Sequence, residues 1–172
     1  GYVAQKDFAC QQARQPWILC VDADEVVSPE LRRSISEAFQ GDPRADGFEL
    51  NRHAFYGGRL INHSGWYPQW RLFLFRRGSA KWGGLEPHAE VVFHTDHKER
   101  LDGDLYHYTY SGIRDHVAKN VKFAQAAAAA MHAEGRRVTI SSLIFRPLWA
   151  VVRCYVLKRG FLDGFHGLVI AA

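Results

Sequence analysis

The chain has 172 residues, a length that allows one domain with a substantial core. Of these residues 47% are hydrophobic and five are tryptophan, a composition that excludes a disordered chain. Its three cysteines are scattered and include no C-x-x-C pair, which excludes a disulfide framework and a cysteine zinc site and is typical of reduced thiols in a cytosolic-side protein. The net charge is +4, and the six basic residues from Arg136 onward are accompanied by one acid, Asp163, so we expect an anionic partner: a membrane surface, a nucleic acid or a phosphorylated substrate.

Both ends of the chain are unusual. Gly1 leads directly into a helical pattern without a starting Met, and the last six residues are almost entirely apolar. We therefore expect a fragment of a longer protein. Residues 1–15 carry charges and lack an apolar core, so no signal peptide is expected within them.

The first 40 residues predict a helix, a strand and a second helix. Residues 2–15 have a helical pattern. Residues 17–21 (WILCV) are five apolar residues in a row, which is typical of a buried strand. The tripeptide Ser-Pro-Glu at 28–30 is a helix start, with Ser as N-cap and Pro in the first turn, so we expect a helix over 29–40.

The rest of the chain predicts several strands followed by two long helices. The expected strands are 47–56, 71–75, 89–93 and 101–106, with a hairpin-like turn at Gly57–Gly58. The expected helices are 113–134 and 142–158. Because strands and helices alternate early and strands then cluster, the chain is expected to be α/β, with a mixed sheet flanked by helices.

Clustered carboxylates directly follow the first predicted strand. Asp22 and Asp24 are two residues apart in an extended segment, so their side chains point the same way. They could share one divalent cation, and hard oxygen ligands suit Mg²⁺ or Mn²⁺. The alternative is an acidic turn exposed to solvent.

A basic and aromatic group surrounds the strand at 71–75. Trp70, Arg71 and Arg76 belong to it. Arginine forks pair well with diphosphates, and aromatic rings stack on sugars and bases. We therefore predict binding of a diphosphate, sugar or base here, and the alternative is an ordinary strand with solvated ends.

Candidate catalytic groups follow a Gly pair at 83–84. Glu90 or Glu86 is a candidate general base, with His88 between them. His107, at a predicted strand end, is a candidate metal or substrate contact. The alternatives are exposed loop carboxylates and a structural histidine.

Residues 145–161 interleave bulky apolar side chains with Arg and Lys. The segment is too short and too charged to be expected to span a bilayer. It fits a helix that lies in the membrane interface, with basic residues toward anionic headgroups. A helix packed against the core is the alternative.

Several stretches resemble glycosyltransferase family 2, which has the GT-A fold. "FACQQARQPWILCVDADE" is similar to the aspartate-motif region of that family. "WRLFLFRRG", "WGGLEPHAEV", "GDLYHYTYSGIRDHV" and "RPLWAVVRCYVLKRGFLDGFHGLVIA" resemble bacterial enzymes that add sugars to the lipopolysaccharide core. The resemblance covers nearly the whole chain.

The resemblance implies roles for individual residues. Asp22 would contact the donor ribose or diphosphate, and Asp24 would hold the metal. In the family the general base is a carboxylate just after the motif histidine. Here His88 is followed by Ala89, and the acidic residue, Glu90, comes one place later. Glu86 is the second candidate for the base. The family's amino-terminal half-Rossmann part has no counterpart in this sequence, so the chain alone could be inactive.

The resulting expectation is an inverting, metal-dependent glycosyltransferase of the hexosyltransferase type. Its donor would be a nucleotide-diphosphate sugar and its acceptor a lipopolysaccharide-core or other lipid glycan. It would lie on the cytoplasmic face of the membrane, with no nucleic-acid partner. Residues 1–110 would form the catalytic and acceptor part and 111–172 a helical, membrane-associating segment. The rival hypotheses are a strand-end-aspartate phosphohydrolase and a non-enzymatic membrane-surface module.

Overall fold

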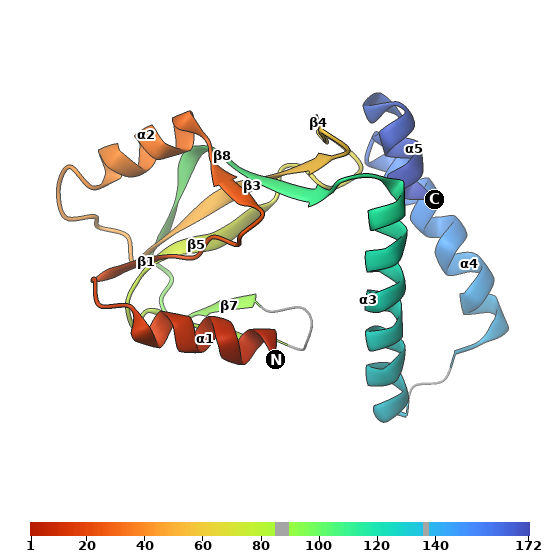
Figure 1. Cartoon of the computed structure of the whole chain (residues 1–172), viewed down its shortest axis with the longest axis horizontal. Helices are drawn as coiled ribbons and strands as arrows, with labels where there is room; N and C mark the ends of the chain where they lie inside the picture. Colours follow the sequence, from red (N-terminus) through yellow and green to blue (C-terminus); the bar gives the residue numbers. More distant parts are fainter. Residues whose placement is uncertain (85–89, 136–137) are drawn as a thin grey trace. The chain divides into compact units, whose positions relative to one another are not determined.

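The computed structural model describes residues 1–84, 90–135 and 138–172, so Glu86 and His88 lie outside the described residues. The elements, shown in Figure 1, are α1 (Tyr2–Gln12), β1 (Trp17–Leu19), β2 (Glu25–Val27), α2 (Pro29–Ala38), β3 (Gly47–Tyr56), β4 (Arg59–Leu60), β5 (Trp70–Arg76), β6 (Ala80–Gly83), β7 (Glu90–Phe93), β8 (Lys98–Tyr110), α3 (Ile113–Ala133), α4 (Ile140–Val151), η1 (Val152–Leu157), η2 (Gly160–Asp163) and α5 (Phe165–Ala171). The described residues form two compact units: unit 1 is Gly1–Arg52 with Gln69–His107, and unit 2 is His53–Pro68 with Tyr108–Ala172.

The main sheet has the strand order β1-β5-β3-β8-β2, with β4 paired to β3. The pairs β1–β5, β3–β5, β3–β4 and β2–β8 are antiparallel. Between β3 and β8 the contacts advance together along both strands: the Asp46 amide donates to the His97 carbonyl, and Asn51 donates to Asp104. These two strands are therefore parallel. The predicted α/β class with a mixed sheet flanked by helices is confirmed.

The core of unit 1 lies between α2 and one face of the sheet. Leu31 of α2 is fully buried against Phe48, Leu50 and Leu105, and further apolar residues complete the cluster. The amphipathic pattern of α2 explains this arrangement, because its apolar side faces the sheet and its charged side faces solvent.

Strand β8 and the start of α2 are in direct backbone contact. The Ser28 hydroxyl caps α2 by accepting from the Leu31 amide at 3.1 Å, and it also accepts from the Asp104 amide at 3.2 Å. Gly103 has a φ of +93°, and a Cβ placed there would lie 2.2 Å from the Leu31 nitrogen. Glycine is required here by both conformation and space.

Unit 2 is built around the β3–β4 hairpin and the loop after it. Gly57 and Gly58 have φ values of +56° and +81°, as a two-residue hairpin turn with both central residues left-handed requires. Buried Asp163 then accepts from the amides of Asn62 and His63 at 3.1 and 2.9 Å. The K-R-G-F-L-D-G motif thus ties the carboxyl-terminal segment to this loop.

The predicted helix over 142–158 begins earlier and changes type. It is α-helical from Ile140 to Val151 and π-helical from Val152 to Leu157. None of the residues of α4 or η1 is buried, so the core-packing alternative is wrong for the described chain. The expectation that the segment is too short to span also needs correction, because its 18 helical residues reach a mean hydropathy of 1.4 and suffice by length and composition alone.

Candidate donor and metal site

The Asp-Ala-Asp-Glu turn between β1 and β2 is held by a buried carboxylate. The side chain of Glu25 is fully buried. Its Oε2 accepts from the Asp22 amide at 2.9 Å, and its Oε1 accepts from Nε of Arg52 at 2.6 Å. The Glu25 amide donates back to the Asp22 carbonyl at 3.0 Å. The turn is therefore fixed from inside the fold, unlike a simple solvated acidic turn.

The other two carboxylates of the turn remain accessible. The side chains of Asp22 and Asp24 are 43% and 49% exposed. The ammonium of Lys6 lies 2.7 and 2.9 Å from the two carboxylate oxygens of Asp22. Asp24 Oδ2 lies 3.3 Å from Nε2 of His107. The structure thus brings together three predicted residues: Asp22, Asp24 and His107.

The position of His107 follows from strand pairing. Strand β2 pairs with β8 in a register that sets Glu25 opposite His107. Burial lowers the pKa of His107 to about 4, and the Arg52 guanidinium acts in the same direction, whereas Asp24 and Asp22 oppose the shift. The imidazole is consequently neutral near pH 7, which is the form that binds metal ions.

The residues fit a partial metal site. Among the described residues, no group of three His, Cys, Asp or Glu side chains is arranged to hold a metal ion by itself. Mg²⁺ is usually bound through one or two carboxylates together with substrate phosphates. The carboxylates of Asp22 and Asp24 match that pattern, and a neutral His107 beside Asp24 would add a nitrogen ligand.

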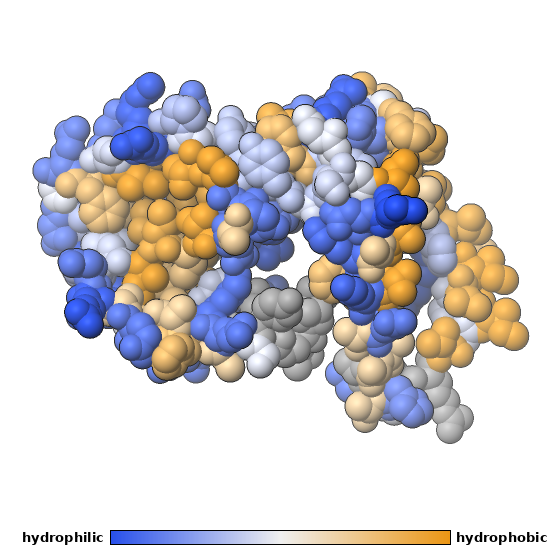
Figure 2. Space-filling model, viewed as in Figure 1, coloured by the Kyte–Doolittle hydropathy of each residue, from blue (hydrophilic) through white to orange (hydrophobic). Residues whose placement is uncertain are grey.

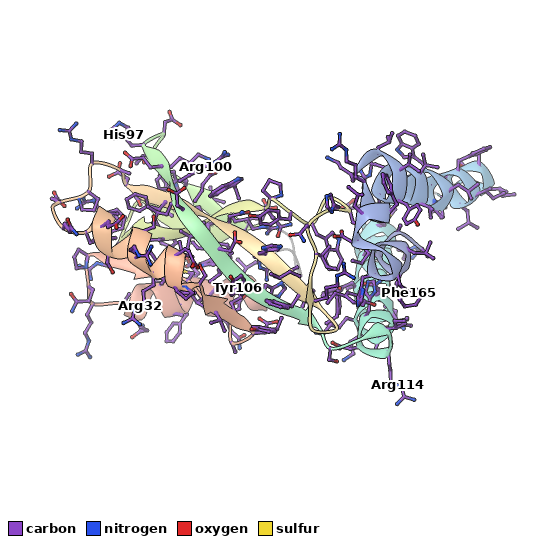
Figure 3. The ribbon with its side chains drawn as sticks, turned by 90° about the horizontal axis from the view of Figure 1, so that it is seen from above. Arg32, His97, Arg100, Tyr106, Arg114 and Phe165 are labelled. Carbon is purple, nitrogen blue, oxygen red and sulfur yellow. The ribbon has the colours of Figure 1, made fainter. Side chains whose placement is uncertain are left out.

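Two predicted donor-binding residues lie at the end of the sheet that carries this turn. Trp70 begins β5, and the carbonyl of the preceding Gln69 accepts from the Arg52 amide at 2.9 Å. The Arg100 guanidinium, labelled in Figure 3, lies 4.7 Å from the centre of the Trp70 ring. Arg71 is exposed on the same strand and is available to an anion.

The structure does not bring Arg76 to this site. In the β1–β5 register it pairs with Trp17, at the opposite end of β1 from Asp22. Its guanidinium lies 3.3 Å from Asp42 and 3.7 Å from Asp46 and packs over the Trp17 ring. Arg76 therefore stabilises the start of β1, and its expected donor contact has no support in this arrangement.

Glu90 is connected to the carboxylate turn through a series of contacts. It is exposed at the start of β7 and pairs with Gly83 of β6. The neighbouring Trp82 has the Lys6 ammonium 4.5 Å from its ring centre, and Lys6 pairs with Asp22. Of the three predicted catalytic residues, Glu90 alone falls within the described residues.

Three important residues were not singled out from the sequence: Lys6, Glu25 and Arg52. Glu25 is adjacent to the D-x-D, but its burial depends on pairing with Arg52, which is 27 residues away. Lys6 lies on α1, 16 residues before Asp22. The one signal available in the sequence was that Lys6 is a basic residue on the predicted helix before the strand at 17–21.

Comparisons with known proteins give relatives for nearly the whole chain. No family model matches the chain. It is 26% identical over 99% of its length to a lipopolysaccharide core biosynthesis glycosyltransferase, LpsC, of Rhizobium meliloti, and spans 66% of that protein. It is also 26% identical over 98% of its length to uncharacterized glycosyltransferases of Rickettsia prowazekii and Rickettsia typhi, spanning 61% of each. The chain thus resembles glycosyltransferases throughout and covers just under two thirds of their length.

Proposed function

We propose that this chain is the catalytic and acceptor-side part of a glycosyltransferase that uses a nucleotide-diphosphate sugar. The observation that carries the proposal is the Asp-Ala-Asp-Glu turn, in which buried Glu25 holds the Asp22 amide and the side chains of Asp22 and Asp24 remain accessible. Carboxyl edges of strands in α/β sheets are common ligand sites. The similarity to named glycosyltransferases supports the same assignment.

In this proposal, Asp24, Asp22 and His107 hold a divalent cation, Mg²⁺ or Mn²⁺. When bound, the cation supplies charge neutralisation for the departing diphosphate. Arg71 adds a positive charge beside the phosphates, and Trp70 offers an aromatic face to the sugar or base. Lys6, which pairs with Asp22 in this structure, would add a second positive charge for the diphosphate.

Glu90 is the proposed general base. It accepts the proton of the acceptor hydroxyl as the acceptor oxygen bonds to the anomeric carbon, and the nucleoside diphosphate leaves from the opposite face with the bonding electrons. The configuration at the anomeric carbon is inverted. Glu86 is the alternative candidate for the general base. The proposed acceptor is a lipid-linked glycan of the lipopolysaccharide-core type, following the name of the Rhizobium relative.

The test is a transfer assay on the full-length protein with UDP-, GDP- and ADP-sugars and solubilised core lipid as acceptor. Glu90→Gln should lower turnover by about 10²-fold or more while leaving donor binding intact, because only proton removal is lost. Glu37→Gln, the same change at an exposed site on α2, is the matched control and should be silent. Full activity of Glu90→Gln would refute the base assignment, and hydrolysis of a simple phosphoester without a sugar donor would favour a phosphohydrolase.

A further inference from the structure

The carboxyl-terminal helical segment exposes an extensive apolar face. Phe145 and Trp149 of α4 are 69% and 58% exposed, and Val152 and Val156 of η1 are also exposed. These four residues follow spacings of four, three and four, which place them along one side of a helix. Figure 2 shows hydrophobic side chains gathered along α4.

Further apolar side chains are exposed beyond η1. They are Phe161 of η2 and, after the non-helical Gly164, Phe165 and Leu168 of α5. Phe165, labelled in Figure 3, projects from the start of α5. Isolated exposed apolar residues are ordinary, but a stripe of large ones along α4 and η1, with further ones on η2 and α5, marks an interaction surface.

The charge of this segment identifies the partner. Residues 138–162 contain four basic residues, Arg146, Arg153, Lys158 and Arg159, and no acidic residue. Arg146 and Arg153 are seven residues apart and so lie on one side of the helix, next to the apolar stripe. A second copy of the chain would bring the same positive charges into contact. An anionic lipid surface complements both the apolar stripe and the charges.

We propose that α4, η1, η2 and α5 form a membrane-docking platform that lies in the plane of an anionic bilayer. The exposed apolar side chains enter the boundary between headgroups and acyl chains, and the four basic residues contact anionic headgroups. A spanning arrangement is disfavoured because Arg146 and Arg153 would then lie within the hydrocarbon layer. This proposal is independent of transfer activity.

The test is sedimentation of the full chain with vesicles of phosphatidylcholine alone or with 30% phosphatidylglycerol, at about 50 and 500 mM NaCl. Binding should require phosphatidylglycerol and weaken at high salt, since the charges are screened. Arg146→Gln/Arg153→Gln should weaken binding about 30-fold, a factor of about five per basic residue. Arg32→Gln/Arg33→Gln removes the same charge from α2, where Arg32 points outward in Figure 3, and should change binding by less than about twofold.

A second matched pair tests the apolar part. Phe145→Ser should weaken binding at least about tenfold, whereas Phe8→Ser, at a similarly exposed position on α1, should not. Equal binding to neutral and anionic vesicles, or equal effects of the paired variants, would overturn the proposal. Resistance to carbonate extraction would show a spanning helix instead. Self-association that Phe145→Ser abolishes, without vesicle binding, would show that a second copy covers this face.

Discussion

Arg52 donates a hydrogen bond from Nε to Oε1 of Glu25 at 2.6 Å, and the side chain of Glu25 is fully buried. This pair joins β3 to the turn that carries Asp22 and Asp24. The Glu25 carboxylate is doubly satisfied, because its other oxygen accepts from the Asp22 amide. The backbone of the accessible Asp22 is therefore held by an ion pair beneath the turn.

The first prediction concerns this ion pair. Arg52→Met should lower the free energy of unfolding by about 3–5 kcal/mol, because it leaves the Glu25 charge buried without its partner. Urea denaturation of the full chain measures the effect. The double variant Arg52→Met/Glu25→Gln should lose less than the sum of the single changes. If the loss of unfolding free energy in the double variant equals the sum of the two single losses, the two side chains do not interact as described.

The second prediction concerns the close approach of β8 to α2. Gly103→Ala should cost at least about 2 kcal/mol of unfolding free energy, since the added Cβ would overlap the Leu31 backbone and the residue has a positive φ. Gly41→Ala is the matched control, because its Cβ would meet nothing within 4 Å. Similar stability of the two variants would contradict the packing of α2 on β8.

Strand β3 and the turn after it could be predicted from the sequence. Residues 47–56 were expected as a strand with the observed bounds, and Gly57–Gly58 was expected as the turn after it. Both signals are local: a run of strand-forming residues and a glycine pair that permits positive φ.

Strand β8 was predicted over 101–106 and extends from Lys98 to Tyr110. Its first residues are charged, and two of them pair with Glu49 of β3, whose carboxylate oxygens lie 2.7 Å from Lys98 Nζ and 3.1 Å from Arg100 Nε. Such long-range pairing leaves no periodic pattern in one sequence. The same reason explains why Arg52 was not recognised as part of the candidate site.

The third prediction concerns Asp163. Asp163→Asn should destabilise the protein by about 1–3 kcal/mol, because an amide offers one acceptor oxygen where the carboxylate satisfies two backbone amides, of Asn62 and His63. Hydrogen exchange of those two amides should accelerate in the variant. Unchanged protection of both would show that the carboxylate does not hold the loop.

The fourth prediction concerns pH and His116. Burial lowers the pKa of His116 from its usual 6.5, while the Asp115 carboxylate opposes the shift. The ring faces Tyr56, Tyr110 and Asn120. Because the unfolded chain takes up the proton first, this contribution to stability is complete above pH 6.5 and is lost as the pH falls below it.

Unfolding free energies at pH 7.5 and 5.5 measure this effect. His116→Asn should reduce the difference between the two values, whereas His97→Asn, at an exposed site, should leave it unchanged. An undiminished pH dependence in His116→Asn would assign the effect to other groups.

The most direct test of the proposed donor site is calorimetric titration of the full-length protein with UDP, GDP and ADP, with and without Mn²⁺. The account predicts that one of these nucleotides binds in a Mn²⁺-dependent manner and that Asp24→Asn weakens this binding at least about tenfold, since one charged oxygen ligand is lost. Asp42→Asn, at an aspartate far more exposed than Asp24, should bind as the unmodified protein does. Mn²⁺-independent binding, or equal affinities in Asp24→Asn and the unmodified protein, would contradict it.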